Sequence, residues 1–438
     1  MRTKTRDTSD YGFHYISGLI RLDSKRNMSH IGRQTKQPEQ SMHHFMSNSP
    51  WSGRDLIEAL QGDMLASGVF TEAVLVIDES ADEKSGTTTV GAGRQNNGRM
   101  GKVDMCQVGV FASLVTPETH CWVDGELFIP EKWFSDDYKD KRKQVGVPED
   151  REFQTKVELA KELILRERQQ GLPFVAVTMD SLYGRSFPLR QELQQEQIEY
   201  YADVPENTMV YLEKPSIAYE LKKNGQPSKK VVVTGIKSEV RYLLDHPNLE
   251  SETIRVRSTQ CGFLEATFYR LPIWTVKGDQ ALQEWLLIRQ NRKKKSYTLS
   301  NASSDTSLAV MAERKTHRFF IERDNQDSKS EFGWDEFQAT KYRAWEHQLA
   351  LTIMAKWFVA TTILEWKEEL DQDPELMVEL NADELPYLSV SNVRELLRAA
   401  MPLPQLSAKE ATDLVVKHFK NRSRSRTSRL RKAKKSRM

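Results

Sequence analysis

Residues 73–80 read AVLVIDES and residues 173–180 read PFVAVTMD, and the order of the surrounding elements follows from these two stretches. Each is a short apolar run that ends in a carboxylate, which is typical of a buried strand. If the two strands are parallel neighbours, they lie about 4.8 Å apart, and Asp78 and Asp180 meet at their carboxyl ends. Two converging carboxylates repel each other unless a divalent cation lies between them, and Mg²⁺ prefers such oxygen ligands. The pair therefore indicates a metal site, although acids at strand ends also serve simply to cap loops.

The residues around these two strands predict an α/β fold. Between them, the segments TTTVGAGRQ, VDMCQVGVFASLV and THCWVDGELFIP are separated by turn residues and are typical of antiparallel strands. A helix is expected over 155–169, because Thr155 and Glu158 form a capping box. A helix over 188–197 then leads to a last strand, IEYYADVP. Because crossover helices make the later strands parallel to the first, the pattern predicts a mixed sheet flanked by helices.

The rest of the chain divides by composition into further regions. Residues 1–70 are expected to form a helical, DNA-binding region in which Ser49 caps a helix that has Pro50 in its first turn. The predicted regions that follow are 71–205 (first part of the core), 206–305 (a β-rich insertion), 306–370 (second part of the core), 371–416 (a C-terminal helical segment) and 417–438 (a basic tail).

The charge of the chain is distributed unevenly. The 438 residues include 64 Lys and Arg against 62 Asp and Glu, but the last 22 residues hold eleven Lys and Arg and no acid. The body before them is therefore slightly acidic, and the tail is expected to be disordered when free and to bind nucleic acid. Such a tail can also be merely solubilising. The tail residues proposed to contact DNA are Arg422, Arg424, Arg426, Arg429, Arg431 and Lys432.

Cysteine content and hydropathy argue against a secreted or membrane protein. Cys106, Cys121 and Cys261 show neither a paired framework nor CxxC spacing, which favours a reducing compartment and no structural zinc. The N-terminus lacks the apolar run of a secretory signal. The most apolar stretch, 349–364, contains Lys356 and is short for a membrane span, so it is interpreted as a buried helix. A soluble, cytoplasmic protein is expected.

A third acid lies on a predicted helix late in the chain. In KTHRFFIERDNQDSK (residues 315–329), Arg318, Glu322 and Lys329 are separated by four and seven residues and therefore share one helix face. This places Glu322 between positive charges, although an ordinary exposed ion-pair face has the same pattern.

These residues together resemble the DDE transposases of bacterial insertion sequences. The resemblance is carried by VLVIDES around Asp78, by GAGRQNNGRMGKVDMCQVGVF, by VTMDSLYGR around Asp180, and by the R-x3-E-x6-K spacing, and it covers roughly residues 11–365. More narrowly, the chain is similar to the group with a Y-x2-R-x3-E-x6-K signature and a β-rich insertion before the catalytic Glu. It departs from that signature at Lys315, which stands at the tyrosine position.

The resemblance implies an RNase H-like core interrupted by the insertion, with Asp78, Asp180 and Glu322 as catalytic and metal-binding residues. They would hold two Mg²⁺ ions, with Mn²⁺ as a substitute, for cleavage at transposon ends and strand transfer into target DNA. The implied partners are terminal inverted repeats and target DNA, and the implied assembly is a homodimer on DNA, associated with the nucleoid when bound. The DNA contacts proposed near the site are Arg318, Lys329, Arg185, Tyr183 and Lys315.

Several alternatives remain open at this stage. Core packing accounts equally well for Tyr183, and surface pairing for Arg185. Other acids that could act as ligands, or be merely solvated, are Glu79, Asp82, Glu83, Asp104 and Glu331. Trp274 and Trp285 could stack on an unpaired base or simply pack. The whole protein could also be a non-catalytic DNA-binding descendant of a transposase, or a metal-dependent endonuclease without strand transfer.

Overall fold

The computed structural model describes most of the chain. The described residues are 6–97, 101–221, 226–259, 262–291, 294–372 and 388–401, with Met1, Thr3, Ser407, Lys409, Val416, Lys420, Arg424 and Thr427. Cys106 and Cys121 are buried and free, whereas Cys261 lies outside the described residues. The tail candidates Arg422, Arg426, Arg429, Arg431 and Lys432 also lie outside them.

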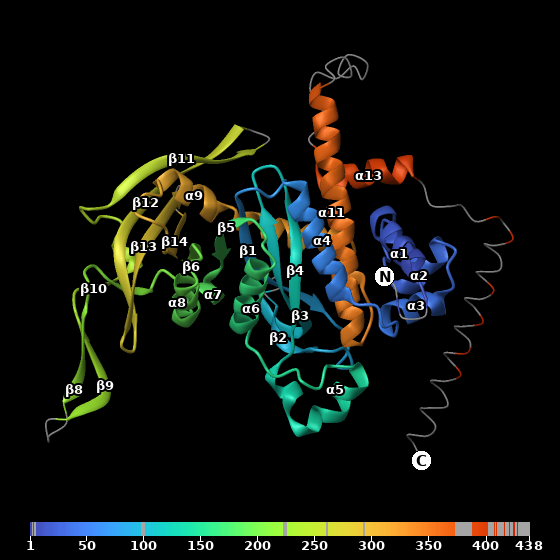
Figure 1. Ribbon diagram of the computed structural model, residues 1–438, viewed down its shortest axis with the longest axis horizontal. Helices are drawn as coiled ribbons and strands as arrows, with labels where there is room; N and C mark the ends of the chain where they lie inside the picture. Colours follow the sequence, from blue (N-terminus) through green and yellow to red (C-terminus); the bar gives the residue numbers. More distant parts are fainter. Residues whose placement is uncertain are drawn as a thin grey trace.

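One mixed sheet of twelve strands forms the centre of the protein (Figure 1). Its core strands are β1 (Ala73–Glu83), β2 (Gly93–Asn97), β3 (Lys102–Val115), β4 (His120–Phe128), β5 (Phe174–Met179) and β6 (Tyr200–Val204). Strand β3 is antiparallel to β1, β2 and β4, whereas β5 is parallel to both β1 and β6. This is the RNase H-like mixed sheet that was expected, and it makes β1 and β5 neighbours.

Burial explains why β1 takes the central position. Residues Val74 to Ile77 have no exposed surface, because helices cover both faces of the sheet. Burying each such aliphatic side chain contributes roughly 1.5–3 kcal/mol. An apolar run without polar alternation therefore belongs in the middle of a sheet that is covered on both sides.

The β-rich insertion continues the core sheet. Its strands are β7 (Met209–Tyr211), β8 (Ser216–Leu221), β9 (Pro227–Thr234), β10 (Lys237–Glu239), β11 (Glu250–Thr259), β12 (Gly262–Lys277), β13 (Gln280–Asn291) and β14 (Lys294–Ser300). Strand β14 pairs antiparallel with β6, so the ladder runs from core to insertion without a break, while β8 and β9 form a separate ribbon. A buried ion pair also connects the core to the insertion, since Arg190 Nε of the core lies 2.8 Å from Glu284 Oε1 of β13.

The helices pack around this sheet. They are α1 (Ser9–Arg21), α2 (Met28–Gln34), α3 (Glu39–Ser47), α4 (Gly53–Ser67), α5 (Lys139–Val145), α6 (Lys156–Gln169), α7 (Ser181–Gly184), α8 (Phe187–Gln195), α9 (Leu308–Thr316), α10 (Arg318–Ser330), α11 (Tyr342–Gln372) and α13 (Val390–Ala400). The first three lie at the opposite end of the molecule from the β8–β9 ribbon (Figure 1).

Helix α11 is the central helix of the α-helical half. It packs against α4, β4, α1, α3 and α13. By length and composition, the segment Tyr342–Glu369 could cross a membrane. However, 61% of its most apolar stretch of 18 residues is buried inside the protein. The apolar surface of α11 is thus largely used in the core, as the interpretation of a buried helix requires.

Two local expectations differ from the structure. Helix α4 begins at Gly53, and its cap is Ser52, whose side chain accepts a hydrogen bond from the Asp55 amide, so Ser49 is not the cap. The segment 315–329, which was expected to lie on one helix, is divided between α9 and α10, which meet at His317, and Arg318 is the first residue of α10. The capping box of Thr155 and Glu158 is present at the start of α6.

Candidate metal centre

The sheet register brings two aspartates together. Ile77 on β1 is paired with Met179 on β5 in the parallel ladder, so Asp78 and Asp180 follow at the same level. Glu79 joins them, and the three carboxylates each offer an oxygen within 4.8 Å of the others. From the sequence, Glu79 was one of several acids that could act as ligands or be merely solvated, and its one signal was its place directly after Asp78.

The proximity of these acids changes their affinity for protons. The pKa of Asp78 is raised to about 8, first by burial and then by the charges of Asp180 and Glu79, while Arg318 acts in the opposite direction. The pKa of Asp180 is also raised, by burial and by Glu79. Such unrelieved repulsion is the electrostatic signature of a site that a divalent cation would neutralise.

Asp180 takes the capping role that was the alternative to metal binding, while it remains one of the converging carboxylates. Its Oδ1 atom accepts a hydrogen bond of 2.8 Å from the amide of Leu182, at the N-terminus of α7. This bond fixes one oxygen of the carboxylate against the helix terminus. It limits the rotation of the side chain, and the carboxylate stays close to Asp78.

Two neighbours hold Glu79 in its place. The hydroxyl of Tyr183 donates to Glu79 Oε2 at 3.0 Å, and Lys156 Nζ lies 3.2 Å from Oε1. Tyr183 has no exposed surface with which to contact a DNA duplex. In this arrangement its hydroxyl orients Glu79 instead. The structure therefore corresponds to the packing alternative for Tyr183, while Arg185 is exposed.

Glu322 lies on α10 beside this cluster and is not among the carboxylates that converge. Its side chain is 55% exposed, and its Oε1 atom is 3.0 Å from Nη2 of Arg318. Burial lowers the pKa of Arg318, but Asp203 and then Glu322, Asp78 and Asp180 raise it, and the net effect is a raised pKa. Arg318 thus lies between Glu322 and the strand-end acids.

Buried polar contacts hold α10 on the sheet. Asp324 Oδ1 lies 3.0 Å from Lys356 Nζ and 2.7 Å from His120 Nδ1, and its Oδ2 accepts a 2.7 Å bond from Ser113. These partners lie on α11, β4 and β3, so three elements fix the helix. Ile321 adds apolar packing, in a cluster with valines of β1 and β3.

The other cations of the signature are engaged with acids of the core. Lys329 Nζ lies 2.9 Å from Asp82 Oδ1 and donates to the carbonyl of Ala81 at 2.7 Å, which ties α10 to β1. Lys315 is buried, and its ammonium group lies 3.2 Å from Asp203 Oδ1. The side chains of Lys329 and Lys315 are 10% and 8% exposed, whereas that of Arg318, which is also paired with acids, is 26% exposed.

Comparison with known proteins gives the family. The model of the DDE superfamily endonucleases matches residues 2–259, which is more than half of the chain. The chain belongs to the DDE superfamily endonucleases. The match includes Asp78, Glu79 and Asp180 and ends before α10, so it covers the converging acids but not Glu322.

A curated relative of this DDE protein is described as a probable transposase for insertion sequence element IS701, from Microchaete diplosiphon. The two are 31% identical over 153 residues, which is 34% of this chain. The matched part spans 36% of the relative's length, or about a third.

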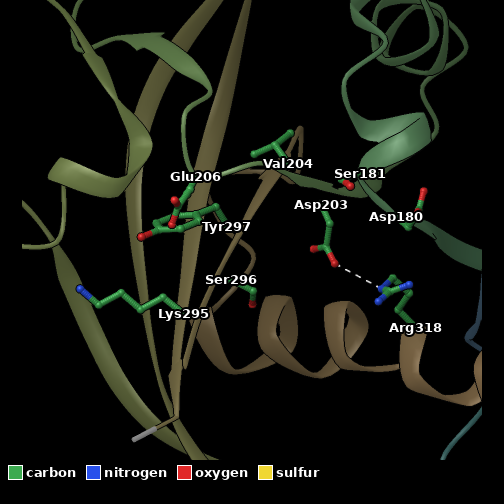
Figure 2. Close-up of a pocket in the computed structure, with 9 residues that line it drawn as sticks. All are labelled: Asp180, Ser181, Asp203, Val204, Glu206, Lys295, Ser296, Tyr297 and Arg318. Atoms are coloured by element: carbon green, nitrogen blue, oxygen red, sulfur yellow. Dashed lines mark ion pairs between the residues drawn. The ribbon is translucent and has the colours of Figure 1, made fainter. Parts of the chain in front are cut away.

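A cavity of about 370 Å³ opens beside the acids of the DDE protein. Figure 2 shows it between the ends of β5 and β6, strand β14 and the start of α10. Asp180, Asp203 and Arg318 line one part of it, and Lys295 and Tyr297 of the insertion line another. Core and insertion therefore both contribute to the wall next to the candidate metal centre.

The two tryptophans of the insertion are packed with cations. The guanidinium carbon of Arg270 lies 4.8 Å from the Trp285 ring centre, and the Trp285 indole donates to the carbonyl of Ala302 at 3.1 Å. Lys214 Nζ lies 5.5 Å from the ring centre of Trp274. Both rings are half-buried, which fits packing and leaves base stacking a prediction.

Proposed function

We propose that this DDE protein is the DNA transposase of an insertion sequence, which cuts DNA at the transposon ends and joins them to a target. The observation that carries the proposal is the convergence of Asp78, Glu79 and Asp180 within 4.8 Å at the ends of parallel strands. The probable IS701 transposase, with its 31% identity, supports the same reaction class.

The donor set suits a hard divalent cation. All three groups are carboxylates, and Mg²⁺ and Mn²⁺ prefer oxygen ligands. Asp78 and Asp180 would hold the metal, with Glu79 or Glu322 as the third carboxylate. When bound, two such ions supply activation of the attacking oxygen and charge stabilisation at the phosphorus.

Arg318 is the side chain best placed to act on the DNA backbone. Its guanidinium is part of the cavity wall beside Asp180, and its planar donors suit the oxygens of a phosphate. In the structure those donors face Glu322 and Asp203. A phosphate that enters the cavity would compete for Arg318, and Glu322 would then be released toward the strand-end acids.

The cleavage reaction tests this proposal. A supercoiled plasmid carrying the DNA that flanks the reading frame is incubated with the protein and Mg²⁺ or Mn²⁺. We expect Asp78→Asn and Asp180→Asn each to abolish cutting while DNA binding is retained, because the isosteric amide removes only the ligand charge. Glu220→Gln, at an exposed ion pair in the β8–β9 ribbon, is the matched control and should cut normally. Normal cutting by both aspartate variants would refute the proposal.

Strand transfer needs a separate measurement, because the same acids serve hydrolysis and transfer. The family description, endonuclease, fits a nuclease that stops after cutting. Pre-cut ends with a free 3′-hydroxyl are therefore offered together with a target plasmid. Covalent joining supports the transposase, whereas cutting without joining supports the endonuclease. Binding without cutting would indicate a non-catalytic descendant.

The partners follow from this proposal. The DNA substrates would be terminal inverted repeats and a target duplex, and synapsis of two ends would require a homodimer on DNA. Cleavage and strand transfer would take place in the bacterial cytoplasm, on the nucleoid. The helices α1–α4 are proposed to recognise the transposon ends. The basic tail is proposed to bind DNA independently of its sequence.

A further inference from the structure

We propose that Asp203 is a positioning residue that keeps the charge of Arg318 beside the metal-binding carboxylates and off their oxygens. The inference rests on the proposed metal-dependent function. It adds a fourth acid to the site, with a task that is distinct from ligation.

Asp203 stands in line with the two strand-end aspartates. Met179 on β5 is paired with Ala202 on β6, so Asp180 and Asp203 follow at one level, just as Asp78 and Asp180 do. Three neighbouring parallel strands thus present Asp78, Asp180 and Asp203 in a row.

The surroundings of Asp203 differ from those of the other two. Its oxygens meet Thr298 Oγ1 at 2.6 Å, Lys315 Nζ at 3.2 Å and Arg318 Nε at 3.2 Å. These donors come from β14, α9 and α10, so the insertion and the second part of the core both converge on Asp203. Among the described residues, the carboxylates that converge as a candidate metal group include Asp78 and Asp180 but not Asp203.

The contact with Arg318 matters because of where that side chain lies. Nε of Arg318 is held by Asp203, while Nη2 reaches Glu322 (Figure 2 shows the Asp203 contact). Without the charge of Asp203, the nearest acids for this guanidinium would be Glu322, Asp78 and Asp180. An arginine paired with Asp78 or Asp180 occupies the oxygens that a divalent ion needs, and a second unbalanced cation, Lys315, would repel the ion further.

The expected effect is therefore on metal affinity. Asp203→Asn keeps the size of the side chain and an acceptor for Thr298 but removes the charge that holds Arg318. We expect the dissociation constant for Mn²⁺ to rise roughly tenfold, the size typical of outer contacts that orient metal ligands. Removal of the competing cation should undo the defect, so the double variant Asp203→Asn with Arg318→Gln should regain most of the wild-type affinity.

The experiment is a Mn²⁺ titration of the full-length protein without DNA, read by electron paramagnetic resonance of the free ion. The variants are Asp203→Asn, Arg318→Gln, their combination, and Asp279→Asn as a control at an exposed acid that accepts from Tyr219. Thermal unfolding checks each variant. A merely structural role for Asp203 predicts that the double variant binds no better than Asp203→Asn.

The outcomes separate the two proposals. If Asp78→Asn binds Mn²⁺ as tightly as the wild type, the metal centre itself is refuted. If Asp78→Asn loses Mn²⁺ while Asp203→Asn binds normally, or if the double variant does not recover, the role of Asp203 is overturned. Should Asp203→Asn not fold, Arg318→Gln decides alone: unchanged or tighter Mn²⁺ binding supports the inference, and weaker binding overturns it.

Discussion

The hydroxyl of Tyr183 donates a hydrogen bond of 3.0 Å to Oε2 of Glu79. Tyr183 is the third residue of the short helix that Asp180 caps, so one turn of chain links two carboxylates of the candidate metal centre. The orientation of Glu79 therefore depends on the same turn that orients Asp180.

Tyr183→Phe tests this link. The ring keeps its packing, but Glu79 loses one of its two orienting contacts, so we expect Mn²⁺ affinity to fall by roughly tenfold. Isothermal titration calorimetry with Mn²⁺ measures this affinity. The control is Tyr201→Phe, which removes a hydroxyl bonded to Glu199, and it should leave the affinity unchanged. Equal affinities in both variants would show that the hydroxyl does not orient a ligand.

Asp78→Asn should stabilise the metal-free protein at alkaline pH. The pKa of Asp78 is about 8 in the folded state, above its ordinary value of 3.8, because of burial and of Asp180 and Glu79. The folded state therefore holds more protons than the unfolded state between these values, and stability falls as pH rises through that window. The advantage of the variant should grow by at most about 1.4 kcal/mol per pH unit from pH 5 to pH 8.

Urea unfolding in EDTA at pH 5, 6, 7 and 8 measures that advantage. Glu58→Gln, an exposed change on α4, is the control and should show no such trend. A pH-independent difference between Asp78→Asn and the wild type would contradict the charge repulsion. Excess Mg²⁺ should reverse the order, since the ion stabilises the folded wild type by binding to it.

Glu79→Gln and Glu322→Gln distinguish the two candidates for the third ligand. Without DNA, Glu79→Gln should weaken Mn²⁺ binding, because Glu79 belongs to the converging carboxylates. Glu322→Gln should bind the ion normally, since its carboxylate is engaged with Arg318, and yet it should lose cleavage. Cleavage at a near-normal rate by Glu322→Gln would place the third ligand elsewhere. Glu331 is the weaker replacement, because Arg394 already binds it.

Asp324→Ala should be among the most destabilising single changes on α10. It leaves Lys356, whose side chain is 4% exposed, without its charged partner in the core. Breaking a buried pair in this way costs about 3–5 kcal/mol, whereas the exposed pair lost in Glu220→Ala is worth about 0–1 kcal/mol. Chemical denaturation gives both values. A loss below about 1 kcal/mol for Asp324→Ala would show that this buried ion pair is not what holds α10 on the sheet.

Truncation after Phe419 tests the tail. It removes most of the eleven basic residues of the last 22, so nonspecific DNA affinity should drop and depend less steeply on salt. Fluorescence anisotropy at several salt concentrations measures the slope. An unchanged slope would exclude a DNA role for these residues.

The sequence alone determined the architecture of the core, because that architecture follows from local patterns. An unbroken apolar run predicts a strand buried on both faces, and a capping box marks the start of a helix, whatever the rest of the chain does. The parallel direction of β1 and β5 was expected from the crossover helices, whereas their pairing as neighbours, which brings Asp78 and Asp180 together, was only assumed and is shown by the structure. The start of α4 was misplaced by a few residues, since Ser52 and not Ser49 caps the helix.

Only the tertiary structure decided what surrounds those two acids. Glu79 is held by Lys156 and Tyr183, and Arg318 meets Asp203, 115 positions earlier in the chain. Spacing along a helix shows that Arg318 and Glu322 share a face, but it does not show which acid of the sheet that face meets. Partners so distant in sequence are brought together by the joint of β14 with β6 and by the buried contacts of α10, and periodicity within a single segment carries no information about either.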